Sequence, residues 1–390
     1  MKITDLHIFE VDASARGNWL FVVIDTDSGI QGVGEASQSG NDELVGVCLR
    51  QLGERIEGAD PTQPEVVWEL TAGASDVFSG TSGRVGATAI SAIDQAMWDI
   101  AGKAADLPAW SLLGGRRRER VRCYANLNRG TTDRSPEGFA RQAQAAVAAG
   151  FRAVKATPFD EVRAAHQDRD GLWSDVEKGL ARLRATREAI GGDIDLLVDC
   201  HCRFDLPLAL RVAEAVKPLD LFWFEEAVPR DQIQANAHIT AHSGQITAGG
   251  ESFFGRAEFE RYVNQQAVHI LMPDVKHAGG MTECRRIAHQ AQVHQVSVAP
   301  HNPAGPVSTM AGVHVAATIP NFLILEWAFG EVPWRGDLLK PAEIVEDGYL
   351  TVPSTPGLGF ELDAKVVATH AVTTGVEQGP PSMGASSPSP

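Results

Sequence analysis

The first third of the chain alternates apolar and polar residues in short extended runs and then changes to a helical repeat. The extended runs are MKITDLHIFEV, WLFVVIDT and IQGVGEA, and Asp27-Ser28-Gly29 supplies a turn before the last of them. This pattern predicts an antiparallel meander. Apolar residues then recur at three- and four-residue steps from Ile90 to Ile100, which predicts a helix that ends near Gly114 and Gly115. Residues 1–118 are therefore expected to form an α+β domain.

From about residue 119, short apolar runs alternate with helix-like segments rich in Ala and Arg. Eight runs occur, at 121–126, 152–157, 194–199, 221–225, 245–251, 267–274, 296–301 and 322–326. Eight strands with intervening helices predict a parallel (β/α)₈ barrel over residues 119–344. A doubly wound sheet fits less well, because no glycine-rich phosphate loop follows the first strand.

The C-terminal part of the chain is extended and punctuated by Pro and Gly. We expect residues 345–377 to return to the N-terminal domain. The low-complexity tail over 378–390 is expected to be disordered.

Composition and charge narrow the class of protein. The 390 residues carry a formal net charge of −16, which argues against a nucleic-acid partner. The N-terminus lacks the apolar core of a secretory signal, and no apolar stretch is long enough to span a bilayer, so no membrane association is expected. Five scattered cysteines do not form a disulfide framework, and a cytoplasmic location is the simplest interpretation.

Ionisable residues occur at the predicted C-terminal ends of six successive strands. They are Asp199, Glu225, Glu251, Asp274, His301 and Glu326, at spacings of 26, 26, 23, 27 and 25 residues. All strand C-terminal ends of such a barrel face one mouth, so these side chains should converge there.

Three of these groups are carboxylates from successive strands, with no Cys or His among them. Asp199, Glu225 and Glu251 thus form a hard oxygen site suited to Mg²⁺, for which Mn²⁺ can substitute. A Mg²⁺ with open positions can hold a substrate carboxylate and stabilise the anion formed when the adjacent carbon loses a proton. The alternative is that these acids cap the following helices. Glu226 should point to the opposite side of its strand and have a structural role.

Asp274 and His301 lie on neighbouring strands and suggest a general base. A buried carboxylate bonded to one imidazole nitrogen fixes the tautomer and raises the basicity of the other nitrogen. The alternative for His301 is a structural histidine at a Pro-flanked turn. Glu326, if held protonated, would hydrogen-bond the growing enolate. Lys155 is a candidate partner of the substrate carboxylate or an electrophile that assists Mg²⁺, and Lys276 is either a second cation of the site or a solvated surface lysine.

The segment IDLLVDCHCRF adds a second histidine. If side chains alternate, Asp199, His201 and Arg203 share one face, with Cys200 and Cys202 on the other. His201 would then point into the mouth, where it can donate a proton to a leaving hydroxyl or act as a second base, and Arg203 would be available to the substrate. Opposite-facing residues cannot chelate one zinc ion, so the Cys-His-Cys run does not indicate a zinc site.

The chain resembles the mandelate racemase branch of the enolase superfamily. The matching motifs are GIQGVGEA, AISAIDQAMWDIAGKAADLPAWSLLGG, FWFEEAV, ITAGGES, LMPDVKHAGGMTE and APHNPAGPVS, in the same order along nearly the whole chain. The resemblance implies an α+β N-terminal capping domain over a modified (β/α)₈ TIM barrel. It also implies Mg²⁺ on Asp199, Glu225 and Glu251, and a His301–Asp274 dyad.

One departure from the family pattern bears on the reaction. Racemases of this branch usually carry Lys-x-Lys on the second strand, whereas this chain has Lys155-Ala156-Thr157. The DCHCR segment with His201 and the turn around His301 resemble the galactonate-type sugar-acid dehydratases. We therefore expect a Mg²⁺-dependent dehydratase that acts on an aldonate or aldarate and yields a 2-keto-3-deoxy acid. An anhydro-sugar-acid cycloisomerase or an epimerase using the same residues remains the alternative.

Substrate choice is expected to depend on two loops of the capping domain, at 12–19 and 73–86. Trp19 and Phe78 are candidates to line this lid, although hydrophobic packing is the simpler role for each. The expected partners are a small anionic sugar acid and further copies of the same chain in a homo-oligomer.

Overall fold

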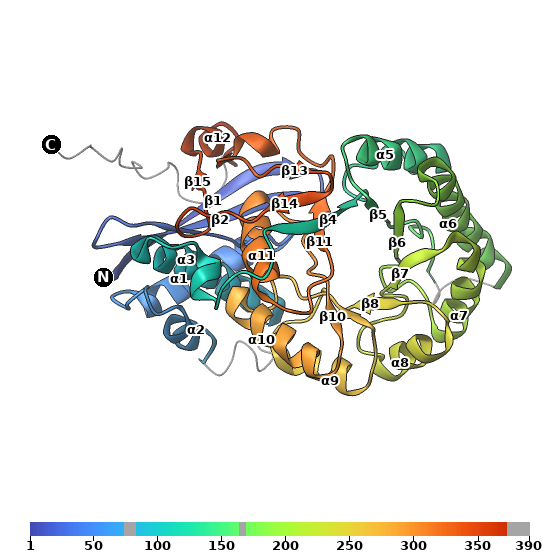
Figure 1. The fold of residues 1–390 in the computed structure, drawn as a ribbon, viewed down its shortest axis with the longest axis horizontal. Coiled ribbons are helices and arrows are strands. Elements are labelled where there is room, and N and C mark those ends of the chain that lie inside the picture. Colours follow the sequence, from blue (N-terminus) through green and yellow to red (C-terminus); the bar gives the residue numbers. More distant parts are fainter. Residues whose placement is uncertain (74–82, 164–168, 373–390) are drawn as a thin grey trace.

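The computed structural model describes residues 1–73, 83–163 and 169–372, which form a capping domain beside a closed barrel (Figure 1). An antiparallel sheet forms the centre of the capping domain, in the order β1-β2-β3, as the alternating pattern predicted. Its strands are β1 (Ile3–Ser14), β2 (Gly17–Thr26) and β3 (Gly32–Glu35), and its helices are α1 (Asp42–Ile56), α2 (Pro64–Ala72) and α3 (Gly83–Ala105).

The glycines of the GIQGVGEA motif let helix α3 pack directly on strand β3. A Cβ on Gly32 or Gly34 would collide with backbone carbonyls of α3, so only glycine fits there. The predicted end of this helix near Gly114 is wrong. Helix α3 ends at Ala105 because Asp106 adopts a left-handed conformation (φ 54°), and the short helix α4 (Ala109–Leu112) follows separately.

All eight predicted barrel strands are present and parallel. Hydrogen bonding runs in the order β10-β9-β8-β7-β6-β5-β4, and β11 pairs with β4. A bridge between Val298 and Phe322 joins the two ends, so the sheet closes into a barrel. The strands are β4 (Arg120–Asn126), β5 (Ala153–Ala156), β6 (Asp195–Asp199), β7 (Leu221–Glu225), β8 (Thr247–Gly249), β9 (Ile270–Leu271), β10 (Ser297–Val298) and β11 (Leu325–Ala328).

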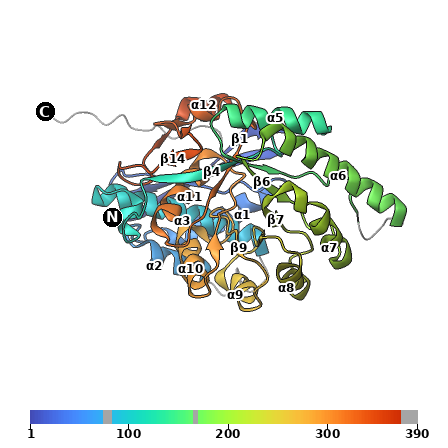
Figure 2. The same cartoon turned by 45° about the vertical axis from the view of Figure 1, so that its right-hand side comes forward.

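Helices that follow the strands cover the outside of the barrel, and α5 to α9 can be followed in turn in Figure 2. They are α5 (Pro136–Ala148), α6 (Arg169–Ile190), α7 (Leu206–Ala215) with the 3₁₀ turn η1 (Lys217–Leu219), α8 (Ile233–His242), α9 (Arg256–Asn264), α10 (Gly280–Val293) and α11 (Pro306–Thr318). One buried cluster is formed by side chains on the barrel strands or directly next to them. Its members include Tyr124, Leu197, Trp223, Met272 and Ile324.

After β11 the chain crosses between the two domains. Strand β14 extends the barrel sheet by pairing antiparallel with β4, and Ala371 then forms a bridge with Val11 of β1. The returning segment therefore touches the barrel before it reaches the capping domain. Its elements are η2 (Arg335–Asp337), β12 (Leu339–Lys340), β13 (Val345–Glu346), β14 (Tyr349–Thr351), β15 (Glu361–Leu362) and α12 (Ala364–Thr369).

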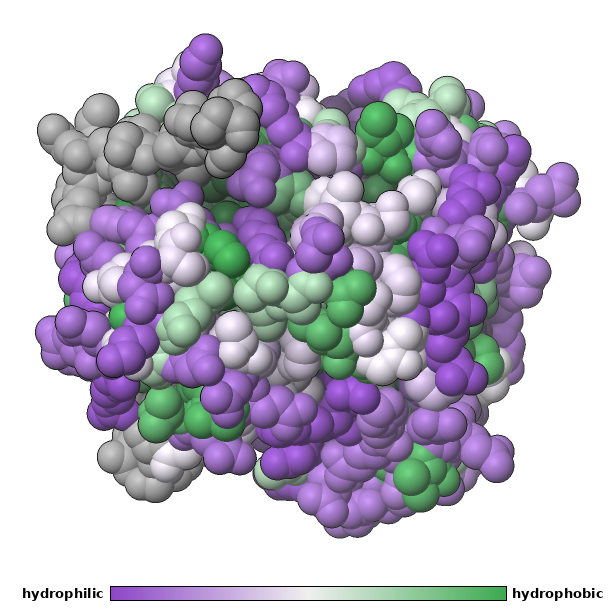
Figure 3. Space-filling model, turned by 60° about the vertical axis from the view of Figure 1, so that its left-hand side comes forward, coloured by the Kyte–Doolittle hydropathy of each residue, from purple (hydrophilic) through white to green (hydrophobic). Residues whose placement is uncertain are grey.

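Hydrophilic residues cover most of the face seen in Figure 3, with a band of hydrophobic and neutral residues across its middle. Helices α1 and α2 of the capping domain expose four large hydrophobic side chains, namely Leu44 and Val47 on α1 and Val66 and Leu70 on α2. The expected homo-oligomer stays a prediction. No described helix combines the length and apolar character needed to cross a membrane.

Candidate active site

Three carboxylates from adjacent strands come together at the C-terminal mouth of the barrel. Asp199 and Glu225 are the last residues of β6 and β7, and Glu251 lies two residues beyond β8. Each offers one oxygen, and these oxygens all lie within 4.8 Å of one another. Asp199 and Glu225 are buried, and the Glu251 side chain is 15% exposed. The set contains only hard oxygen donors, which fits Mg²⁺ or Mn²⁺.

The charge of this trio is only partly compensated by the protein. Burial raises the pKa of Glu225, and the nearby Asp199 and Glu251 raise it further against the opposing effect of Lys155. Despite burial, the charge of His201 lowers the pKa of Asp199 to about 2. A divalent cation would relieve the remaining repulsion, so the donor set and its electrostatics both fit a metal.

Lys155 is buried against Glu225 of the trio. Its Nζ is 2.9 Å from Glu225 Oε1 and 3.3 Å from Glu326 Oε1, and the side chain is 1% exposed. Although burial opposes it, these carboxylates raise the pKa of Lys155 well above its usual range. Lys155 is thus an ammonium bridge between two acids, which disfavours a role as the base.

The groups around Glu326 favour its ionised form over the protonated form considered from the sequence. It receives the backbone N–H of Asn302 at 2.9 Å as well as the ion pair from Lys155. These groups lower the pKa of Glu326 even though it is buried. The side chain is therefore a carboxylate and an acceptor, not a donor to an enolate.

His301 and Asp274 are in contact, as their neighbouring strands suggested. His301 Nδ1 is 2.7 Å from Asp274 Oδ2, and Nε2 faces the trio at 3.2 Å from Glu251 Oε2. A carboxylate only accepts hydrogen bonds, so Nδ1 carries the proton and Nε2 is directed toward the trio. Although burial opposes it, Glu251 and Glu326 raise the pKa of His301.

His201 reaches the trio at Asp199, but not by strand alternation. Strand β6 ends at Asp199, and both His201 (φ 46°) and Cys202 (φ 57°) are left-handed. This turn places His201 Nε2 2.7 Å from Asp199 Oδ2. His201 therefore lies beside Asp199 as expected, but the left-handed turn brings it there and strand alternation does not. Arg203 makes no described side-chain hydrogen bond or ion pair, and its contact with substrate stays a prediction.

Glu226 lies closer to the trio than its place on the strand suggested. Its φ of 40° turns the side chain, whose oxygens accept from Gly250 N at 3.1 Å and from Cys202 Sγ at 3.3 Å. Burial and the charge of Glu251 raise the pKa of Glu226 to about 7. Glu226 supports the loops that carry Glu251 and His201.

Lys276 is buried beside the dyad, so the surface interpretation of this residue is wrong. Its Nζ lies 3.2 Å from Asp274 Oδ2 and 2.7 Å from His277 Nε2. The other nitrogen of His277 is 2.8 Å from Thr88 Oγ1 on helix α3. Neither His277 nor Thr88 was predicted from the sequence to belong to the site. The dyad is thereby connected through Lys276 to the capping domain.

Glu35 of the GVGEA motif fixes the loop that carries His301. This fully buried residue ends β3 and accepts the N–H groups of Gly305 at 2.7 Å and Ser308 at 2.9 Å. It thus caps α11, which begins five residues after His301, with a carboxylate from the other domain. The motif was among those that carried the family resemblance, but no role was predicted for its glutamate.

A cavity of about 330 Å³ lies between the capping domain and the barrel and is lined by His301, Lys276 and Trp19 among others. Trp19 is 2% exposed and packs edge-on against Trp334 at 5.4 Å between ring centres. The predicted loop 12–19 is largely strand, since β1 runs to Ser14 and β2 starts at Gly17. Most of the loop 73–86, with Phe78, lies outside the described residues.

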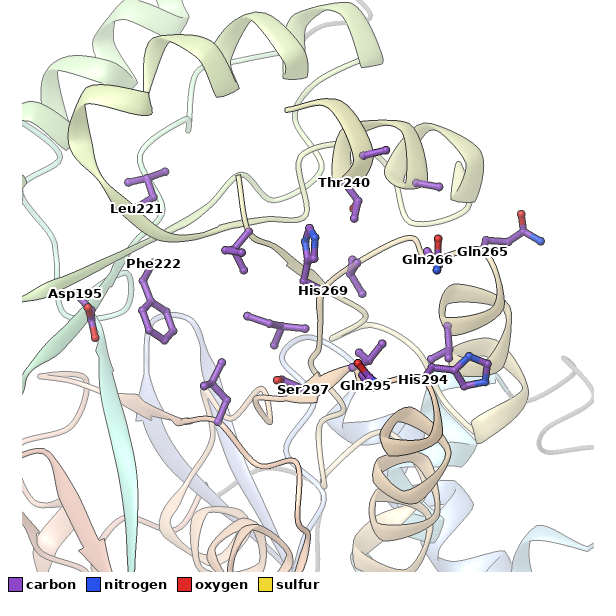
Figure 4. Close-up of a pocket in the computed structure, with 18 of the residues that line it drawn as sticks. Asp195, Leu221, Phe222, Thr240, Gln265, Gln266, His269, His294, Gln295 and Ser297 are labelled. Atoms are coloured by element: carbon purple, nitrogen blue, oxygen red, sulfur yellow. The ribbon is translucent and has the colours of Figure 1, made fainter. Parts of the chain in front are cut away.

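A larger cavity, of about 900 Å³, lies at the opposite end of the barrel (Figure 4). Leu221 and Ser297, which start β7 and β10, line it together with Phe222, His269 and His294. It contains none of the three clustered carboxylates. The smaller cavity is not lined by these carboxylates either, but it is lined by His301, whose Nε2 lies 3.2 Å from Glu251 Oε2. The candidate active site therefore adjoins the smaller cavity.

Comparison with known proteins agrees with this geometry. Residues 7–114 match the N-terminal domain of the mandelate racemase / muconate lactonizing enzyme family, and residues 138–366 match the enolase C-terminal domain-like family. A D-xylonate dehydratase of Haloferax volcanii is 32% identical over 95% of this chain and 89% of its own length. A D-galactonate dehydratase of Variovorax paradoxus is 33% identical, over 95% and 94%.

Solved structures show the same architecture. A mandelate racemase/muconate lactonizing enzyme from Sulfitobacter sp. superimposes with a TM-score of 0.87 at 31% identity, over 98% of this chain and 99% of that one. The chain therefore belongs to the enolase superfamily, in its mandelate racemase branch. It is an enzyme, a hydro-lyase with a capping domain and a (β/α)₈-type barrel.

Proposed function

We propose that the protein is a metal-dependent sugar-acid dehydratase that converts an aldonate or aldarate to a 2-keto-3-deoxy acid. The observation that carries the proposal is the placement of two histidines on different members of the carboxylate trio. His301 contacts Glu251 and His201 contacts Asp199. A β-elimination needs one group to take a proton and another to give one, and this arrangement supplies both.

In this proposal His301 removes the proton at C2 with Nε2. Asp274 keeps the proton of the imidazole on Nδ1, so the lone pair of Nε2 stays directed at the substrate. His201 then donates its proton to the departing oxygen at C3, so that oxygen leaves as water. The C2–C3 enol that remains tautomerises to the 2-keto acid.

Asp199, Glu225 and Glu251 would hold the metal, which we propose to be Mg²⁺ with Mn²⁺ as a substitute. When bound, the metal would supply a positive charge that stabilises the substrate carboxylate while removal of the C2 proton adds a second negative charge to the substrate. Lys155 holds Glu225 in place through its ion pair, and Glu326 holds the loop after His301 by accepting the N–H of Asn302.

The relatives favour a sugar acid as substrate, because the two described above are named for xylonate and galactonate. Thr157 stands where racemases of this branch carry the second lysine of Lys-x-Lys, and its hydroxyl faces Asp199 at 3.5 Å. A threonine cannot act as the base on that side, which favours elimination over racemisation.

The test is a screen of the purified protein with Mg²⁺ against aldonates and aldarates, reading the 2-keto product. In deuterated water the product should carry solvent deuterium at C3. His201→Asn should slow elimination much more than exchange of the C2 proton, and equal loss of both would contradict its role as the acid. An epimer or a cyclised isomer as the only product would replace the dehydratase by an isomerase.

A further inference from the structure

Three cations line the cavity that leads to His301, and no acid lines it among the residues that the structure describes. The cations are Arg84, Arg129 and Lys276. This is unusual in a chain whose formal net charge is −16. A pocket with this lining favours an anionic ligand beyond the carboxylate that the metal would hold.

Two of the three cations already have a carboxylate partner. Lys276 Nζ is 3.2 Å from Asp274 Oδ2, and Arg129 Nη1 is 2.5 Å from Oε1 of Glu331, whose side chain is 2% exposed. Arg84 differs, because its Nε is buried and has no hydrogen-bond partner among the described residues. Arg84 is thus the cation of the cavity with unused hydrogen-bonding capacity.

A second unpartnered group lies in the same cavity. Gln38 is 7% exposed, and its Oε1 is buried without a hydrogen-bond partner. Both Gln38 and Arg84 belong to the capping domain, whereas His301 belongs to the barrel. A buried donor and a buried acceptor left unpaired are costly unless a ligand satisfies them.

We propose that Arg84 and Gln38 bind the distal end of the substrate and select a sugar diacid, an aldarate, over an aldonate. This inference rests on the proposed function, which places the first carboxylate and C2 beside the trio and His301. The other end of the substrate then faces the capping domain. There Arg84 receives the second carboxylate, and Gln38 Oε1 accepts a hydrogen bond from a hydroxyl.

The chemistry explains why a diacid is preferred. A terminal hydroxymethyl group offers Arg84 only a neutral acceptor, whereas a carboxylate makes charge-assisted hydrogen bonds that are roughly twice as strong. A phosphate at the distal end would supply the same charge, but 330 Å³ is at the small end of ligand pockets and suits the smaller carboxylate. The relatives above are named for monoacids, so this chain would differ from them in substrate.

The test compares galactarate with galactonate, which differ only at C6, and adds a 6-phosphorylated aldonate. The wild type should show a higher kcat/KM for the diacid. Arg84→Gln should lower the ratio of diacid to monoacid kcat/KM by roughly 10- to 100-fold, and Arg84→Lys should restore part of it. Arg286→Gln is the matched control, since Arg286 joins Glu65 and Glu283 between the domains without lining the cavity.

Three outcomes would overturn the inference while leaving the proposed function intact. They are a preference for galactonate, a preference for the phosphorylated acid, or a ratio that Arg84→Gln and Arg286→Gln change equally. If no sugar acid is dehydrated, the proposed function fails instead. Calorimetric binding of the diacid and the monoacid to the wild type and to Arg84→Gln then still decides whether Arg84 recognises the second carboxylate.

Discussion

The two mouths of the barrel offer opposite environments, although the same eight strands build both. The amino-terminal mouth has the larger cavity, about 900 Å³, whose apolar and polar lining includes the carboxylates Asp195 and Asp220 but none of the clustered trio (Figure 4). The carboxyl-terminal mouth has about 330 Å³ under the capping domain, yet it collects the carboxylate trio and both histidines. Cavity size therefore does not locate the chemistry here. What locates it is the direction of the strands, which brings successive strand ends to one place.

The largest expected effect is on the base at the carboxyl-terminal mouth. His301→Asn should lower turnover by roughly 10²–10⁴-fold, because a positioned acid–base group contributes about that much. Exchange of the substrate C2 proton should stop, while thermal stability and metal binding are retained. His294→Asn at the amino-terminal mouth is the control and should leave exchange intact. Near wild-type exchange in His301→Asn would mean that another group is the base.

The second-largest expected effect is on metal affinity, which should depend on residues at the carboxyl-terminal mouth and not on residues at the amino-terminal mouth. Glu251→Gln keeps the shape of the side chain but removes one charge of the trio, so Mg²⁺ affinity should fall by at least roughly 100-fold, more than outer partners of a metal typically cost. Chelation should abolish wild-type turnover, and Mg²⁺ or Mn²⁺ should restore it. Asp220→Asn, which removes a carboxylate from the lining of the larger cavity, should not change the affinity measured by calorimetry. Full activity of metal-free protein would contradict the proposed metal site.

The stability contributed by the contact between Asp94 of the capping domain and Thr282 of the barrel should depend on pH. Asp94 of α3 accepts from Thr282 N at 3.0 Å and Thr282 Oγ1 at 2.5 Å, and burial raises its pKa to about 7. Because the pKa of Asp94 is higher in the folded state than in the unfolded state, this group contributes its full stabilisation of the fold at a pH below the unfolded pKa. The contribution is lost as the pH rises toward the folded-state pKa of about 7. Between pH 4 and 7, wild-type stability should therefore fall relative to Asp94→Asn by up to a few kcal/mol.

Thermal unfolding across that pH range checks the Asp94 prediction. Asp106→Asn is the control, because Asp106 is an exposed carboxylate just beyond the same helix. A stability difference between wild type and Asp94→Asn that stays constant with pH would mean that Asp94 is ionised throughout.

The smallest effect is expected at the amino-terminal mouth itself. Ile246 lines the larger cavity and is 48% exposed, so Ile246→Ser should change stability by no more than about 0.5 kcal/mol and leave turnover unchanged. Denaturant unfolding and steady-state kinetics measure both quantities. A clear loss of turnover would show that this mouth takes part in the reaction after all.

The strands and the strand-end residues could be predicted because both follow from local pattern. Apolar runs of regular spacing predicted β4 to β11, and the parallel direction of these strands predicted that Asp274 and His301 would meet. The position of His201 near Asp199 was also expected, but the turn that produces it was not. Left-handed backbone at His201 and Cys202 interrupts the alternation that the strand pattern assumes.

Contacts between the domains could not be predicted from pattern. Thr88 and His277 lie 189 residues apart, and Glu35 lies 273 residues from Ser308. These pairs depend on how the capping domain docks on the barrel, which no local periodicity encodes. The ionised state of Glu326 was missed for the same reason, since it depends on donors that the fold assembles from Lys155 and Asn302.

The bridge between Val11 and Ala371 also has a consequence for how the enzyme is made. Asp12 N–H donates to His370 C=O and Val372 N–H donates to Glu10 C=O, so the first strand of the chain is completed by residues near position 371. A ribosome releases the capping sheet long before it adds these residues. The nascent chain must therefore hold an unfinished edge of β1 through the synthesis of the whole barrel. Only when translation passes residue 372 can that edge be closed.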